Sequence, residues 1–123
     1  MGYRVVDPEE IEPAPDRPCE LRRLSEAAGL DRMAINRYRA APGEQIPLAY
    51  HYHDEQEEAF YVISGTLSVE TPEETYRVEA DQFFVAEPGS PHRAHVGDEA
   101  EGPARVIGVG APPVSDGHSY EGE

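Results

Sequence analysis

Residues 43–65 read GEQIPLAYHYHDEQEEAFYVISG, and this stretch decides the fold that we predict. His51 and His53 are two residues apart, so in a β-strand their side chains share one face. An acidic turn at 54–57 follows, and an apolar, aromatic run then ends at Gly65. A strand that begins after the turn would return the Glu58 carboxylate to the side that the two histidines face. The pattern therefore predicts two short strands that share one cavity.

Strand-like segments separated by glycine and proline turns continue on both sides of this stretch. We predict strands at 33–39, 48–53, 59–64, 66–70, 76–78, 82–86, 91–96 and 104–109, and a short helical turn at 20–30 that stops at Gly29. Many short strands at even spacing indicate an all-β sandwich or closed barrel. We expect one domain, with an extended N-terminal arm at 1–31, a barrel at 32–111 and a flexible C-terminal tail at 112–123. The arm could pair with the barrel edge or with a second subunit.

A third histidine completes a set of metal-ligand residues. His92 follows the turn Pro88-Gly89-Ser90-Pro91, which would aim it at the cavity from another strand. Three imidazoles and one carboxylate suit a divalent transition metal ion such as Mn, Fe, Co, Ni or Zn, whereas calcium and magnesium prefer more oxygen ligands. Four protein ligands leave two positions of an octahedral ion open. Glu57 is the alternative to Glu58 as the carboxylate ligand.

The spacing of these residues resembles the two sequence motifs of the cupin superfamily. The first motif is matched by Gly43, His51, His53, Glu58 and Gly65, and the second by Ala80, Asp81 and the run EPGSPH at 87–92. Ala80, Glu87 and Val96 stand where the family prefers glycine, proline and asparagine, and none of them is a metal ligand. The resemblance implies a small single-domain cupin with a double-stranded β-helix (jelly-roll barrel) fold. It also implies one metal ion on His51, His53, Glu58 and His92.

The alternation of residues along the strands predicts which side chains face the interior. Leu67 and Val69 share one face of their strand. The residues expected to line the barrel with Glu58 are Phe60, Val62 and Ser64, and we expect Phe83 and Val85 to do likewise. Tyr50 and Tyr52 alternate with the two histidines and should point outward. His95 falls on the opposite strand face to His92, Cys19 is expected to be a small buried or arm residue, and His118 has no expected role.

Residues that could contact a substrate are weaker predictions than the metal ligands. The candidates for substrate contact are Arg37, Tyr38, Gln45 and Arg93. The candidates for a general acid or base are Arg37, Tyr61 and Gln82. For each of the four substrate-contact candidates, we favour a structural role over contact with a substrate.

The charge of the chain limits its partners. There are 25 acidic residues, ten arginines and no lysine, which gives a formal net charge of −15. Nucleic acid and anionic membrane surfaces would be repelled. Either a basic partner or adaptation to a salty cytoplasm explains the acidity, and we favour the second because the acids are spread along the chain. Melting temperature should then rise with salt, which screens self-repulsion.

The remaining sequence features indicate a cytoplasmic protein. Cys19 is the only cysteine, so no internal disulfide can form, and the chain shows neither a long apolar span nor a secretory signal. We expect a homodimer, because two-fold pairs are the commonest assembly and outward Tyr50 and Tyr52 suit an interface.

Three functions are compatible with this set of residues. The leading one is a metal-dependent enzyme, dioxygenase- or isomerase-like, that acts on a small oxygen-rich organic molecule. The alternatives are a module that binds or senses a small ligand without turnover, and a protein in which the metal is a structural staple. Open coordination positions favour the enzyme.

Overall fold

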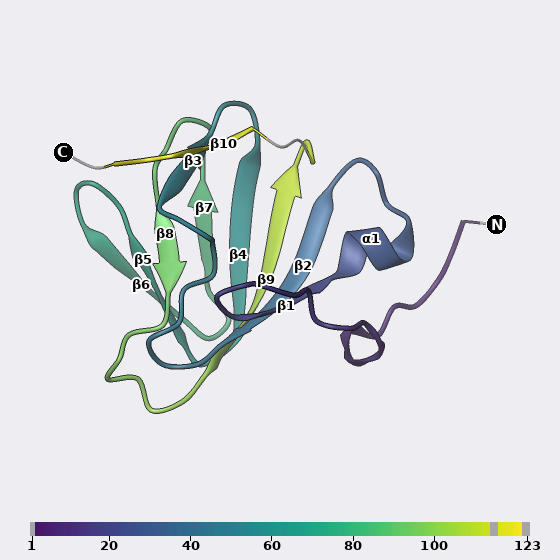
Figure 1. Ribbon diagram of the computed structural model, residues 1–123, viewed down its shortest axis with the longest axis horizontal. Helices are drawn as coiled ribbons and strands as arrows, with labels where there is room; N and C mark the ends of the chain where they lie inside the picture. The colour runs from purple at the N-terminus through teal and green to yellow at the C-terminus, as the bar shows by residue number, and fades with distance from the viewer. Residues whose placement is uncertain (1, 114–115, 122–123) are drawn as a thin grey trace.

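The computed structural model describes residues 2–113 and 116–121 (Figure 1). Strands dominate, with one short α-helix and one 3₁₀ turn among the described residues. In chain order the elements are η1 (Pro8–Glu10), β1 (Glu20–Arg23), α1 (Leu24–Ala28), β2 (Ala34–Ala40), β3 (His51–His53), β4 (Glu57–Ser64), β5 (Thr66–Glu70), β6 (Thr75–Glu79), β7 (Phe83–Ala86), β8 (Arg93–His95), β9 (Ala104–Ala111) and β10 (Gly117–Ser119). The expected all-β class is confirmed.

The strands form two antiparallel layers. One layer has five strands in the order β1-β2-β9-β4-β7. The other contains the sheet β6-β5-β8 and the pair β10-β3, which an isolated bridge between His51 and His92 attaches to the beginning of β8. Figure 1 shows the two layers facing each other, with β3 and β10 across one end. The fold is the predicted jelly roll, with two facing layers rather than one closed ring of strands in the described part of the chain.

The core lies between the two layers and is built by simple alternation. Phe60 and Val62 of β4 are buried, as are Leu67 and Val69 of β5, which confirms their predicted inward faces. Burial of such side chains is the main favourable term in folding. Cys19 joins this cluster and is also buried.

Phe83 and Val85 do not line the interior, and their prediction is wrong. They are 65% and 66% exposed. The register of β7 against β4 explains the error, because it pairs Phe84 with Phe60. Residues directly opposite each other in an antiparallel pair point to the same side. Phe84 therefore packs against the core, and its neighbours along β7 face outward.

Two terminal segments are more ordered than the sequence indicates. Residues 20–23 form β1, which pairs with β2 at the edge of the larger sheet, so the helical turn predicted at 20–30 shrinks to α1. Its end at Gly29 is confirmed, with the left-handed φ of +72° that glycine adopts readily. The tail predicted to be loose contains β10, which pairs with β3. Isolated three-residue strands carry little sequence signal, because their stability comes from the partner strand.

No helix in the described ranges 2–113 and 116–121 is long and apolar enough to cross a membrane.

Candidate metal site

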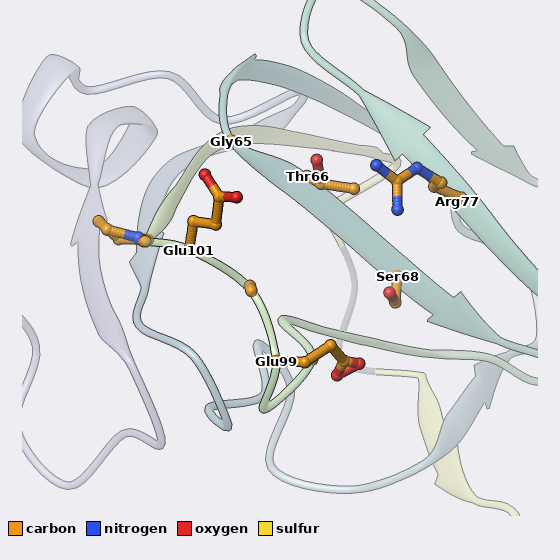
Figure 2. A pocket seen from close by; sticks show the side chains of 10 residues that line it. Gly65, Thr66, Ser68, Arg77, Glu99 and Glu101 are labelled. Carbon is orange, nitrogen blue, oxygen red and sulfur yellow. The ribbon is translucent and has the colours of Figure 1, made fainter.

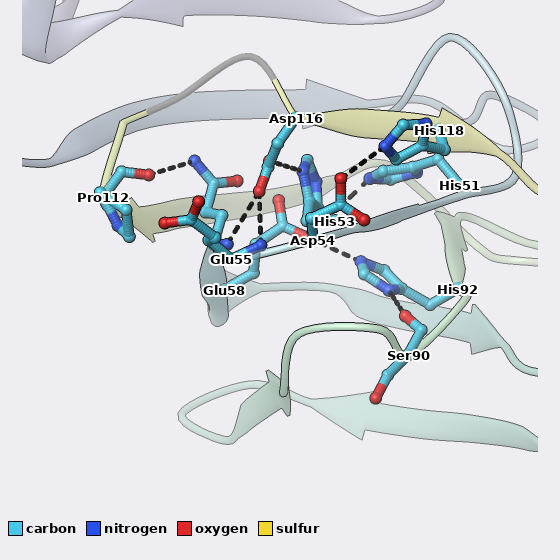
Figure 3. Close-up of polar contacts among 11 residues, drawn as sticks. His51, His53, Asp54, Glu55, Glu58, Ser90, His92, Pro112, Asp116 and His118 are labelled. Atoms are coloured by element: carbon cyan, nitrogen blue, oxygen red, sulfur yellow. Dashed lines mark hydrogen bonds and ion pairs between the residues drawn. The ribbon is translucent and has the colours of Figure 1, made fainter.

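The four predicted ligands come together from three segments of the fold (Figure 3). β3 carries His51 and His53, β4 carries Glu58, and His92 precedes β8. The Oε1 atom of Glu58 lies 2.7 Å from Nε2 of His92, 3.5 Å from Nε2 of His53 and 3.8 Å from Nε2 of His51. Donor atoms of His51, Glu58 and His92 all lie within 4.8 Å of one another, so these three are positioned for a metal ion.

The Nδ1 atom of each of the three imidazoles lies within hydrogen-bond distance of an oxygen atom. Nδ1 of His51 lies 3.0 Å from the Ala49 carbonyl oxygen, and Nδ1 of His92 lies 2.8 Å from that of Ser90. A carbonyl can only accept, so each Nδ1 carries the proton and donates it. This leaves Nε2 as the inward-facing nitrogen. Metal-binding histidines are oriented in the same manner, with the second nitrogen donating to an oxygen.

His53 supplies the test of whether a metal fits. Its Nε2 atom is buried and has no hydrogen-bond partner among the described residues. A buried polar atom without a partner is costly, by about 1 to 3 kcal/mol. A divalent ion placed among the three Nε2 atoms and Glu58 would satisfy it. The donor set, with three imidazoles and a carboxylate, therefore fits a first-row divalent ion.

The carboxylate and the histidines shift one another's pKa values. Burial alone would raise the pKa of Glu58, but the hydrogen bond from His92 and the nearby imidazoles outweigh it and lower the pKa below its usual value. Burial lowers the pKa of His51. For His92, burial is outweighed by its bonds to Glu58 and Ser90, and the pKa is raised. The Glu58 carboxylate is thus ionised and able to bind a cation.

Asp116 is a residue of the candidate site that the sequence prediction missed. Its Oδ1 accepts a hydrogen bond from Nδ1 of His53 at 2.9 Å. Its Oδ2 accepts from the backbone N–H groups of Glu55 and Gln56, at 2.6 and 3.1 Å. The backbone bond from Glu55, together with the bonds from His53 and Gln56, lowers the pKa of Asp116 to about 2. Asp116 follows His53 by 63 residues, so no local pattern could reveal the pair.

Replacing Asp116 with asparagine should weaken metal binding about 10- to 100-fold. The amide can still accept from the imidazole, but it carries no charge to raise the basicity of His53. Competition titration with a chromogenic chelator would measure the change. Asp54→Asn is the matched control, because Asp54 bonds to His118 rather than to a ligand. Equal affinities for Asp116→Asn and wild type would show that Asp116 does not support the site.

A cavity of about 340 Å³ opens beside the four ligands. Tyr38 and Phe60 line its interior wall, and Arg17 reaches it from the N-terminal arm. Residues 117–119 also line it. His118 pairs with Tyr52 across the β10–β3 ladder and stacks on its ring, which places the His118 side chain on the face opposite His51 and His53. Because residues 117–119 line the cavity, β10 forms one of its walls.

The candidates for substrate contact and for a general acid or base, Tyr38 apart, are absent from the lining of this cavity. Arg37 is buried under the arm, where it pairs with Glu9 and Glu20. Arg93 bonds to Glu70 and to Gln45. Tyr61 donates to Asp81, and Gln82 accepts from the backbone of Glu79. Nδ1 of His95 lies near the carbonyl oxygen of Arg93, and the residue is absent from the cavity lining. Only Tyr38 of the predicted substrate contacts lines the cavity.

A larger hollow, of about 670 Å³, lies where β5 and the 97–103 loop meet (Figure 2). Its charged lining residues are Arg77, Glu99 and Glu101, and no histidine or cysteine is among its described lining residues. It has no cluster of metal-ligating nitrogens within the described chain. The smaller cavity is therefore the candidate functional site, because chemistry depends on the convergent donors rather than on volume.

Comparison with known proteins agrees with this architecture. The model of the family described as "Cupin domain" matches residues 36–110, which include all four predicted ligands. The chain belongs to the cupin superfamily. This confirms the resemblance that the two histidine motifs carry in the sequence.

Three similar proteins align with most of the length of this cupin. "Polyketide synthase CurC" of Streptomyces cyaneus is 38% identical over 125 residues, which cover 96% of this chain and 77% of that protein. The polyketide cyclase RemF of Streptomyces resistomycificus has a TM-score of 0.78 at 19% identity, over 95% of this chain and 84% of that one. A sugar phosphate isomerase of Silicibacter pomeroyi has a TM-score of 0.81 at 23% identity, over 96% of this chain and 82% of that one. The two structural similarities establish the fold alone.

Proposed function

We propose that this cupin binds one divalent transition metal ion on His51, His53, Glu58 and His92 and catalyses ring closure of a small poly-oxo molecule of the polyketide type. The observation that carries the metal site is the buried Nε2 of His53, which lacks a hydrogen-bond partner among the described residues and faces the Glu58 carboxylate. The 38% identity to a protein named as a polyketide synthase supports the substrate class.

The residues around the site suit such a reaction. When bound, the ion supplies Lewis-acid polarisation of a carbonyl oxygen. The chain contributes a cavity with apolar walls, which include Ile46, Leu48 and Phe60. A cavity of about 340 Å³ lies within the range of roughly 300 to 1,000 Å³ that holds small organic ligands. Such walls would exclude water and hold a flexible chain in a folded conformation, which favours an intramolecular reaction.

The experiment has two stages, of which the first is metal analysis of the purified protein. We expect one ion per chain. The second stage offers heptane-2,6-dione to the loaded protein and follows 3-methylcyclohex-2-enone by its ultraviolet absorbance. In this conversion one carbon–carbon bond forms and one water molecule leaves. We expect acceleration by the loaded protein and none by the metal-free protein. Oxygen consumption during the reaction would indicate a dioxygenase instead, and ligand binding without product would indicate a binding module.

We also propose that the protein is a homodimer, and an exposed apolar surface supports this. Phe83 and Val85 project from β7, which pairs with β4 alone among the described strands and so ends the larger sheet. An open edge strand with apolar side chains can pair with the same strand of a second copy about a two-fold axis. Light scattering should give twice the chain mass of 13.6 kDa. A mass equal to that of one chain would contradict the dimer.

A further inference from the structure

Arg17 has features that the metal site does not explain. It lines the cavity together with His51, Glu58 and His92, although it belongs to the N-terminal arm. Its Nε atom is buried and has no hydrogen-bond partner among residues 2–113 and 116–121. One terminal nitrogen lies 3.4 Å from the Ile46 carbonyl oxygen, which is a long and weak bond. Within the part of the chain that the structure describes, most of the hydrogen-bonding capacity of this guanidinium is therefore unused.

Arg17 has no carboxylate partner among the described residues, although its Nε atom is buried. Other arginines form ion pairs, namely Arg22, Arg37, Arg77 and Arg93. No carboxylate of the described residues lies within 4.0 Å of the Arg17 guanidinium, although the chain has 25 acidic residues. A buried guanidinium nitrogen without a partner costs free energy that a bound anion would recover. The arrangement is thus suited to an anionic group from outside the chain.

The charge of the cavity supports the same conclusion. The charged lining residues, apart from the histidines, are Arg17 and Glu58. Their charges cancel, so a bound divalent ion would leave the cavity with two positive charges. A guanidinium presents a planar fork of donors that matches the two oxygens of a carboxylate. A cationic cavity with such a fork should select an oxyanion.

We propose that Arg17 is a specificity residue that binds a carboxylate of the substrate, at a position separate from the oxygens that face the metal. This inference rests on the proposed metal site and narrows the substrate class to anionic poly-oxo compounds. Arg17 does not hold the metal. Its loss should weaken the binding of an anionic ligand and leave a neutral ligand unaffected.

The test compares two ligands that differ by one carboxylate. Acetylacetone and 2,4-dioxopentanoate share the diketone that can face the metal, and only the second carries a carboxylate. Isothermal titration calorimetry on the metal-loaded protein would measure both. We expect wild type to prefer 2,4-dioxopentanoate and Arg17→Gln to lose about 10- to 100-fold of that affinity, as for a charge-assisted hydrogen bond. Affinity for acetylacetone and for the metal should stay unchanged.

The matched control is Arg39→Gln, which removes one positive charge from an exposed position on β2 outside the cavity lining. It should leave both ligand affinities as in wild type. An equal loss of affinity for 2,4-dioxopentanoate in Arg39→Gln would show that the effect of Arg17→Gln comes from net charge alone, and would overturn the proposal. The proposal would also be overturned if Arg17→Gln kept the preference for 2,4-dioxopentanoate over acetylacetone, or if wild type showed no such preference. If Arg17→Gln does not fold, Arg17→Lys replaces it in the test. Lysine keeps the positive charge but lacks the planar fork of donors. Its affinity for 2,4-dioxopentanoate should fall at least about threefold, and its affinity for acetylacetone should stay as in wild type.

The result is separable from the proposed function. Failure of wild type to bind a metal would refute the metal site. The charges of Arg17 and Glu58 would then cancel, and the cavity would have no net positive charge to select an anion. A wild type that binds metal and both ligands, but whose preference ignores Arg17, would refute only the role of Arg17. A lower melting temperature as the sole effect of Arg17→Gln would mean that the side chain merely ties the arm to Ile46.

Discussion

Replacing His92 with alanine should lower the affinity for a divalent ion by at least about 100-fold, because it removes one bond to the ion outright where loss of a supporting contact costs 10- to 100-fold. His92 is 2% exposed, and its Nε2 lies nearest to Glu58 of the three imidazoles. Cobalt is a suitable probe, since its visible absorption reports the number and type of ligands. The same chelator competition used for Asp116→Asn would provide the dissociation constant.

The control for His92→Ala is His95→Ala at the end of β8, the strand that His92 precedes. His95 is absent from the cavity lining, and its Nδ1 lies near the backbone of Arg93, so its loss should leave the metal affinity as in wild type. His92→Gln guards against a simple packing defect, because glutamine retains most of the volume and lacks the imidazole. Full metal stoichiometry and affinity in His92→Ala would show that the metal binds elsewhere.

The second large effect is expected at the turn between β4 and β5. Gly65 has a φ of +81°, and a Cβ atom built there would lie 2.5 Å from the Pro103 carbonyl oxygen and 2.7 Å from Cα of Ala104. Both neighbours are backbone atoms, which cannot rotate away. Gly65→Ala should therefore lower the free energy of unfolding by about 2 to 5 kcal/mol, which combines the left-handed backbone with overpacking. Urea unfolding measures this loss directly.

Gly89 separates the two contributions. Its φ of +80° is nearly the same, but nothing lies within 4 Å of a Cβ atom at that position. Gly89→Ala should cost only the backbone term, about 1 to 2 kcal/mol. The difference between the two variants then measures the collision with the 103–104 backbone. Equal losses would mean that this segment shifts freely to admit the methyl group.

Features that depend on neighbouring residues could be predicted from the sequence. The two-residue spacing of His51 and His53, and the alternation around Leu67 and Val69, follow from the geometry of a single strand. Sequence therefore determined the all-β class, the order of the predicted ligands and the inward faces of β4 and β5. The end of α1 at Gly29 was equally local, since it needs only a residue that tolerates a positive φ.

Features that depend on the pairing of distant segments were decided only by the tertiary structure. The contact of Asp116 with His53 spans 63 residues, and the approach of Arg17 to the cavity requires the arm to lie along the barrel. The direction of Phe83 depends on the register of β7 against β4, because a shift of one residue reverses every side chain of a strand. Strand pairing across such distances is set by the whole core, and no short stretch of sequence contains that information.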